Sequence, residues 1–185
     1  MKKTTITLAL LALLLTVAPA AAESTNLSIA GNDVHVSYPD GWEMFNENPD
    51  DYYFVWSSGD EEMIGMINLY SGEDYGVSND AILEEYGGDE AAMLDAMMEA
   101  LVGAIENASG DYELRFGSYE KVGSDPAYYA SIEYYDNWDG IAYYNLDTMY
   151  LYAGQIYYQD AFCLVEKESV FKNNVLGFID GLSFH

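Results

Sequence analysis

Carboxylates are the most abundant reactive groups of this sequence, with 32 Asp and Glu among 185 residues. The turn-like segment 136–140 holds Asp136 and Asp139 close together, and carboxylate oxygens are the ligands that calcium prefers. Two further acidic segments, 50–51 and 60–62, have the same character. None of the three has the spacing of an EF-hand loop, and Asp, Asn and Gly are also ordinary turn residues. The sequence therefore leaves two interpretations open: calcium bound by Asp136 and Asp139, or a plain turn.

The common catalytic motifs are absent from the sequence, which has no Gly-x-Ser-x-Gly, His-Glu-x-x-His, phosphate loop or Cys-x-x-Cys. Its only histidines are His35 and His185, and its only cysteine, Cys163, lies in an apolar run that predicts a buried thiol. A pair of carboxylates could hydrolyse glycosidic bonds, but nothing singles out two of the 32. We therefore predict no catalytic residue and a protein that is not an enzyme. A secreted hydrolase that uses paired carboxylates is the alternative.

Tyrosine is the other conspicuous side chain, with 18 copies that include five adjacent pairs. Neighbours in a strand point to opposite faces of a sheet, so one ring of each pair has to leave the main core. If a helix covers the second face, these rings are packed. If that face is bare, they form an aromatic platform for a sugar or a peptide. The candidates for this platform are Tyr129, Tyr135, Tyr143, Tyr157 and Trp138.

The first 22 residues have the pattern of a cleavable secretory signal peptide. Lys2 and Lys3 precede a leucine-rich apolar run at 6–17, and small residues at 18–22 suit signal peptidase. The apolar run is shorter than the roughly 20 residues that cross a bilayer as a helix. We expect cleavage after Ala22, with cleavage after Ala20 as the alternative. Residues 23–185 are then predicted to form a single domain outside the cytoplasm, secreted, periplasmic or at the cell surface.

The charge of the mature chain limits its partners. All 32 acidic residues lie beyond residue 22 but only four of the six basic ones do, which gives the mature chain a net charge of −28. Nucleic acids and anionic membranes attract proteins through Lys and Arg, so we expect no nucleic-acid binding and no membrane insertion. The acidity is either a solvated surface or a means of attracting a cationic partner, such as a basic protein face, a polyamine or a divalent metal ion.

Apolar periodicity predicts the strands that would carry these side chains. Short strand-like segments come first, at 27–30, 34–38, 52–57 and 62–70. Four longer strands rich in Tyr, Ile and Val follow later, at 112–122, 127–135, 141–152 and 155–165. The turns between the four are too short for anything but antiparallel neighbours.

Two helices are predicted between and after these strands. In segment 89–107 the residues Met93, Met97, Leu101 and Ile105 recur every four positions, with a shorter helical turn at 80–86 before them. A closing helix starts near residue 169. The order of elements predicts an α+β domain with a large antiparallel sheet and two main helices, which cover one face or both.

Two segments of the sequence resemble the PsbP-like group of extracytoplasmic domains. They are the segment 36–42, a strand that ends in a Pro-Asp-Gly-Trp turn, and the closing helix with Phe178, Ile179, Leu182 and Phe184. The resemblance covers most of the mature chain in the order of its elements. It implies an α/β/α sandwich that acts as a non-catalytic accessory or interaction module. We therefore expect an exported binding or protein-interaction domain for a protein or a glycan, a cationic partner being one option. A structural cell-surface component that binds calcium is a further alternative.

Overall fold

One large antiparallel sheet dominates the structure. The computed structural model describes residues 22–57, 63–108, 112–122 and 127–185. Seven strands pair in the order β3-β4-β5-β9-β8-β7-β6, and every pairing between them is antiparallel. Their bounds are Trp42–Asn48 (β3), Asp51–Ser57 (β4), Met63–Asp74 (β5), Tyr112–Val122 (β6), Ala127–Trp138 (β7), Ile141–Tyr152 (β8) and Gln155–Leu164 (β9). The predicted α+β class with a large antiparallel sheet is confirmed.

A small second sheet joins the two ends of the described chain. It has three strands in the order β1-β2-β10, with bounds Ala22–Ile29 (β1), Asn32–Pro39 (β2) and Ser183–Phe184 (β10). The β1–β2 hairpin turns at Gly31, whose φ of 80° is a left-handed conformation that glycine adopts without strain. The last strand, β10, pairs with β2, so the C-terminal segment lies beside the β1–β2 hairpin.

The helices form where the sequence predicts them. Their bounds are Asn79–Glu85 (α1), Glu90–Ala108 (α2), Val165–Lys167 (η1, a short 3₁₀ helix) and Glu168–Asp180 (α3). The side chain of Asp89 accepts hydrogen bonds from the backbone amides of Ala91 and Ala92 at the start of α2, which is the role of an N-cap residue. The predicted stripe of Met93, Met97, Leu101 and Ile105 is buried along α2.

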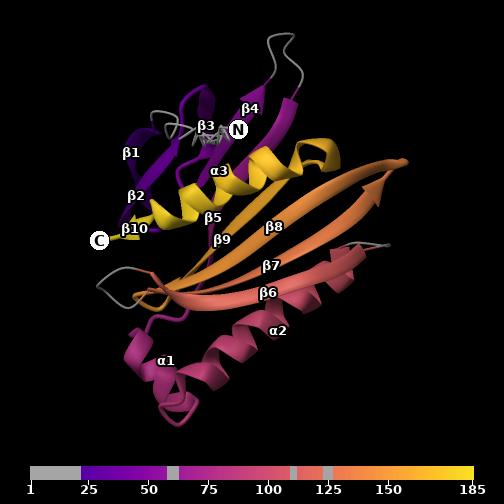
Figure 1. Cartoon of the computed structure of the whole chain (residues 1–185). Helices are drawn as coiled ribbons and strands as arrows, with labels where there is room; N and C mark the ends of the chain where they lie inside the picture. Colours follow the sequence, from indigo (N-terminus) through magenta and orange to yellow (C-terminus); the bar gives the residue numbers. More distant parts are fainter. Residues whose placement is uncertain (1–21, 58–62, 109–111, 123–126) are drawn as a thin grey trace, which may run out of the picture.

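The helices cover both faces of the large sheet, as Figure 1 shows. On one face α3 and the small sheet enclose a core that contains Phe54, Tyr150 and Phe178. On the other face α2 packs on β6, β7 and β8 and encloses a second core with Met93, Leu101 and Ile132. The architecture is thus an α/β/α sandwich, and the question left open by the sequence is answered: the two main helices lie on opposite faces.

The tight turn between β8 and β9 is fastened to the segment before α1. The backbone amide of Gly154 donates to the side-chain oxygen of Asn79 at 2.9 Å, and the Gly154 carbonyl accepts from the amide of Tyr75 at 2.9 Å. The buried Asn79 also donates to the carbonyl of Leu151. Gly154 has a φ of 78°, and a Cβ there would lie 1.7 Å from the carbonyl oxygen of Val77. Only glycine fits this turn without displacing the α1 segment.

Within the described parts of the chain, none of the helices has the length and apolar character needed to cross a membrane.

Candidate ligand-binding site

Two aspartates face each other on the sheet surface that carries α2. Asp147 of β8 and Asp160 of β9 are directly opposite in the strand register, which places their Cβ atoms about 5 Å apart on the same face. Each accepts a hydrogen bond from a tyrosine of the outer neighbouring strand: Tyr134 donates to Asp147 at 2.9 Å and Tyr70 donates to Asp160 at 3.0 Å. We refer to Asp147 and Asp160 as the carboxyl pair.

The carboxyl pair lies at the floor of a hollow of about 430 Å³, which we call the α2 pocket. One wall is the side of α2, where the small Ala100 and Ala104 leave room that larger residues would fill. Because α2 packs on β6, β7 and β8, the pocket extends beside the helix over β5 and β9. The remaining lining is mainly aromatic and thioether: Met66, Tyr70, Tyr134, Trp138, Met149, Tyr158 and Phe162.

Burial and mutual repulsion perturb the titration of the carboxyl pair. Burial, followed by the charge of Asp160, raises the pKa of Asp147 to about 8, although hydrogen bonds from Tyr134 and the Ala161 backbone oppose the shift. Burial also raises the pKa of Asp160. The pair therefore keeps a proton at pH values where an ordinary aspartate has lost it. Burial first and the nearby carboxylates second raise the pKa of Tyr70 and Tyr134, so both phenols remain hydrogen-bond donors.

The α2 pocket has more hydrogen-bond acceptors than donors. Asn68 of β5 is directly opposite Asp160, and its buried Oδ1 atom has no hydrogen-bond partner within the described parts of the chain. Asp136 is 8% exposed, and its carboxylate accepts from the side chain of Asn145 at 3.1 Å. The described residues that line the pocket include no Lys, Arg or His. Its negative groups therefore have no positive partner among them.

The other face of the same sheet gives a useful contrast. Glu133, on β7, is buried there, and both of its carboxylate oxygens contact Nζ of Lys172 from α3, at 2.6 and 2.8 Å. A buried carboxylate normally has such a partner, because an unpaired buried charge is costly. The carboxyl pair is half-buried and has no such partner among the described residues of the pocket lining, and this is the feature that marks the α2 pocket as a candidate site.

Three of the five candidates for the aromatic platform are packed, which is one of the two alternatives that the sequence leaves open. Tyr157 is fully buried, and Tyr129 and Tyr135 pack against the core beneath α3, on the face opposite the α2 pocket. Only Tyr143 and Trp138 lie on the α2 face, with ring centroids 5.9 Å apart and Trp138 61% exposed. The adjacent tyrosines do alternate between faces, as expected, but a pattern of period two does not say which face each member takes. The tyrosine rings that line the pocket are Tyr70, Tyr134 and Tyr158, and of the five candidates only Trp138 lines it with them.

The two predicted calcium ligands have different surroundings. Asp136 is buried beside Asn145, whereas Asp139 is exposed in the β7–β8 turn with a φ of 52°. In this turn the amide of Gly140 donates to the side chain of Asn137 at 2.8 Å, an ordinary turn contact. Over the described ranges, no three His, Cys, Asp or Glu side chains are grouped to hold a metal ion. Calcium binding by Asp136 and Asp139 therefore stays a prediction that needs further ligands from outside this turn.

The single cysteine and the two histidines have ordinary packing or hydrogen-bond contacts. Cys163 is buried as predicted, and burial raises the pKa of its thiol to about 12, so it is not a reactive thiolate. His35 makes a hydrogen bond with the side chain of Asn26, and His185 with that of Ser183.

A signal for the carboxyl pair was present in the sequence but was missed. The predicted tight turn at 153–154 joins the strands that hold Asp147 and Asp160. In a hairpin the turn sets the register, and counting back from Tyr152 opposite Gln155 brings Asp147 opposite Asp160. Asn68 and Tyr70 could not be found in this way, because β5 reaches β9 only through the tertiary fold.

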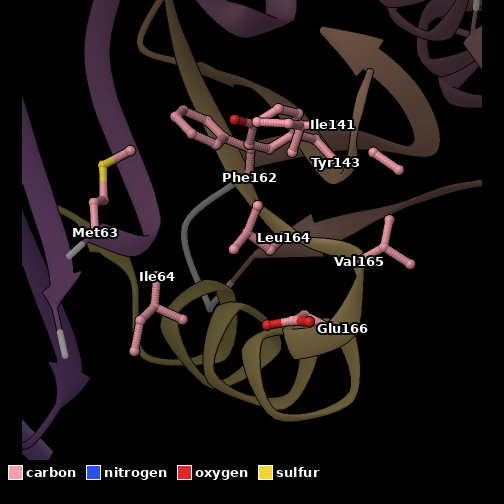
Figure 2. Close-up of a pocket in the computed structure, with 9 residues that line it drawn as sticks. Met63, Ile64, Ile141, Tyr143, Phe162, Leu164, Val165 and Glu166 are labelled. Carbon is pink, nitrogen blue, oxygen red and sulfur yellow. The ribbon is translucent and has the colours of Figure 1, made fainter. Parts of the chain in front are cut away.

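A second hollow, of about 490 Å³, adjoins the α2 pocket at Phe162. Figure 2 shows Met63 and Ile64 of β5 on one side of it and Leu164, Val165 and Glu166 on the other. Glu166 is the only charged residue of the described lining. We assign no ligand to this apolar hollow, because its lining holds no group of residues that could recognise one.

Comparison with known proteins supports the fold. No family model matches the chain, and no curated protein matches it. The solution structure of cyanobacterial PsbP (CyanoP) from Synechocystis is similar with a TM-score of 0.57 and 14% identity, over 90% of this chain and 95% of that one. A protein of unknown function from Pseudomonas aeruginosa is similar with a TM-score of 0.53 and 10% identity, over 87% of this chain and 96% of that one. LpqN of Mycobacterium tuberculosis, described as involved in cell envelope biogenesis, is similar with a TM-score of 0.51 and 11% identity, over 88% of this chain and 91% of that one. The chain therefore has a PsbP-like fold, as its sequence predicted.

Proposed function

We propose that this protein is an exported, non-catalytic binding domain that holds a small ligand in the α2 pocket. The observation that carries the proposal is the carboxyl pair, which lies at the floor of an aromatic hollow without a basic partner in the described lining. Such an arrangement destabilises the free protein, and perturbed titratable groups in a concave site are typical of functional sites. The PsbP-like fold is compatible with this role but does not specify it.

Filling the α2 pocket is expected to abolish ligand binding. Ala104 is exposed on α2 and lines the pocket, so Ala104→Trp places an indole in the hollow and leaves the helix surface otherwise unchanged. A thermal-shift screen should cover amines, amino acids, sugars, nucleosides and short fatty acids, because a ligand of the folded state raises Tm. We expect a binder whose Kd rises at least about tenfold in the variant.

The matched control for this variant is Ala92→Trp, which adds the same ring to an exposed α2 position outside the pocket lining. It should leave the Kd unchanged. The proposal fails if no compound binds the wild type, or if Ala104→Trp and Ala92→Trp bind equally well.

The chemical fate of the bound compound separates this proposal from a hydrolase. A carboxyl pair that shares a proton could in principle act as acid and base. In this protein each carboxylate accepts a tyrosine hydrogen bond that holds it in place, which suits the binding of a ligand. We expect mass spectrometry to recover the ligand unchanged after long incubation. Cleavage that Asp160→Asn stops would establish the hydrolase instead.

Export predicts a defined amino terminus. β1 begins at Ala22, and the carboxylate of Glu23 accepts a hydrogen bond from Tyr38 at 3.1 Å, so cleavage after Ala22 retains the β1–β2 contact. Expressed in a secreting host, the full chain should appear in the extracytoplasmic fraction with Glu23 as its first residue. Intact-mass measurement checks this. A functional protein that retains residues 1–22 in the cytoplasm would contradict export.

A further inference from the structure

Three acceptor side chains form one row across the middle of the large sheet. Asp147 on β8 is opposite Asp160 on β9, and Asp160 is in turn opposite Asn68 on β5. Side chains at directly paired positions lie on the same face about 5 Å from each other. All three line the α2 pocket, and the Oδ1 atom of Asn68 is buried without a hydrogen-bond partner in the described structure. The Oδ1 atom of Asn68 therefore lacks a donor, which a ligand could supply.

We infer that the ligand is a primary organic ammonium ion, bound by Asp147, Asp160 and Asn68 at the floor of the α2 pocket. The inference rests on the proposed function and specifies its ligand class. An ammonium group has three N–H donors and no acceptor, which matches three acceptor side chains in a row. Its charge supplies the positive partner that the described lining residues do not provide.

The walls of the pocket suit the rest of such a molecule. The rings of Tyr70 and Tyr158 stack with centroids 5.4 Å apart beside the row, and aromatic faces attract organic cations. Met66, Met149 and Phe162 supply apolar surface for an alkyl chain. A neutral alcohol of the same length would gain the apolar contacts but would leave the carboxyl pair without a counter-charge. The charge of the whole chain, −26 for the full sequence, also draws cations toward the protein.

Binding of the ammonium ion competes with protonation of the carboxyl pair. The other titratable groups that face it are Asp51 on β4, Tyr70 on β5, Tyr134 and Asp136 on β7, and Tyr158 on β9. The residues of α2 that line the pocket, Ala100, Leu101, Ala104 and Ile105, carry no charge. Because an alkylammonium stays charged throughout, its affinity should rise at least about tenfold between pH 5 and pH 8.

Calorimetric titration of the mature protein with n-hexylamine and n-hexanol at pH 8 and low salt tests the inference. We expect hexylamine to bind at least about tenfold more tightly than hexanol. Asp160→Asn, which removes one charge of the pair, and Asn68→Ala, which removes the unpaired acceptor, should each weaken hexylamine binding. Far-ultraviolet circular dichroism verifies that both variants are folded.

Asp95→Asn is the matched control, because it removes the same charge from an exposed position of α2 outside the pocket lining. It should leave the hexylamine Kd within about twofold. Equal losses in Asp95→Asn and Asp160→Asn would show general attraction to an acidic surface and would overturn the inference. Equal affinities for hexylamine and hexanol would also overturn it. If a neutral compound binds and Ala104→Trp excludes it, the proposed function holds and the ammonium assignment alone fails.

Discussion

Replacing Asp147 by asparagine is expected to make the free protein more stable at pH 8 and to remove its affinity for hexylamine. Burial and the charge of Asp160 raise the pKa of Asp147 to about 8 from its ordinary value of 3.8. Between these two values the folded state keeps a proton that the unfolded state has lost. The free energy of unfolding of the wild type therefore falls as the pH rises from about 4 to about 8.

The variant Asp147→Asn has no charge to lose at this position, so its stability should not show this part of the pH dependence. A pKa raised from 3.8 to about 8 would correspond to about 5 kcal/mol at pH 8, and solvent that reaches the half-buried carboxyl reduces this value. We therefore expect a gain of at least about 2 kcal/mol, or at least about 4 °C in Tm. The amide oxygen of the new side chain can still accept the hydrogen bond from Tyr134. Greater stability together with lost binding is the behaviour of a group kept for function.

Melting curves at pH 4, 6 and 8 for the wild type, Asp147→Asn and Asp95→Asn measure this effect. Asp95→Asn changes the net charge equally at an exposed position of α2 and should follow the wild-type pH dependence. An Asp147→Asn variant that is less stable than the wild type at every pH would show that Asp147 serves the fold through Tyr134 and not a ligand.

Replacing Gly154 by alanine is expected to cause the largest loss of stability among the glycine positions. Its φ of 78° strains any side chain, and the new Cβ would lie 1.7 Å from the Val77 carbonyl oxygen. The turn or the α1 segment has to move, which breaks the contacts of Gly154 with Asn79 and Tyr75. We expect a loss of about 3–5 kcal/mol and a drop in Tm of roughly 10 °C or more.

Gly140→Ala separates backbone strain from the clash. Gly140 has a similar φ of 83° in the β7–β8 turn, but a Cβ there meets no atom within 4 Å. This variant should lose only about 1 kcal/mol, the cost of the left-handed conformation. Equal losses in the two variants, measured by chemical denaturation, would show that the contact between the β8–β9 turn and the α1 segment does not determine stability.

Local patterns were enough to predict most of the fold. The four-residue spacing of the α2 methionines and the alternation in β7, β8 and β9 both depend on neighbours in the sequence, and both are confirmed. β3 was missed because the segment Trp42–Asn48 mixes three apolar and four polar residues without a regular alternation. Its pairing with β4 is therefore not visible in the sequence. The separation of β1 and β2 into a small sheet also depends on packing with α3, which no local pattern reveals.

The candidate site was less predictable than the fold. The register of the β8–β9 hairpin can be counted from its turn, so Asp147 and Asp160 could have been paired in advance. Their surroundings could not, since Asn68 and Tyr70 come from β5 and the helical wall comes from α2. Tyr129, Tyr135 and Tyr157, named as candidates for an exposed platform, are packed instead, because α3 and the small sheet cover the face on which they lie.

Carbon-13 NMR of the aspartate carboxyl carbons tests the central claim most directly. In the free protein the account predicts that a resonance of the carboxyl pair, assigned through Asp147→Asn and Asp160→Asn, titrates far above pH 4. Saturating hexylamine should lower that midpoint by at least about one pH unit, because the ammonium ion replaces the proton. Ordinary midpoints near pH 4 for both carboxyl groups, or a titration that hexylamine leaves unchanged, would contradict the account.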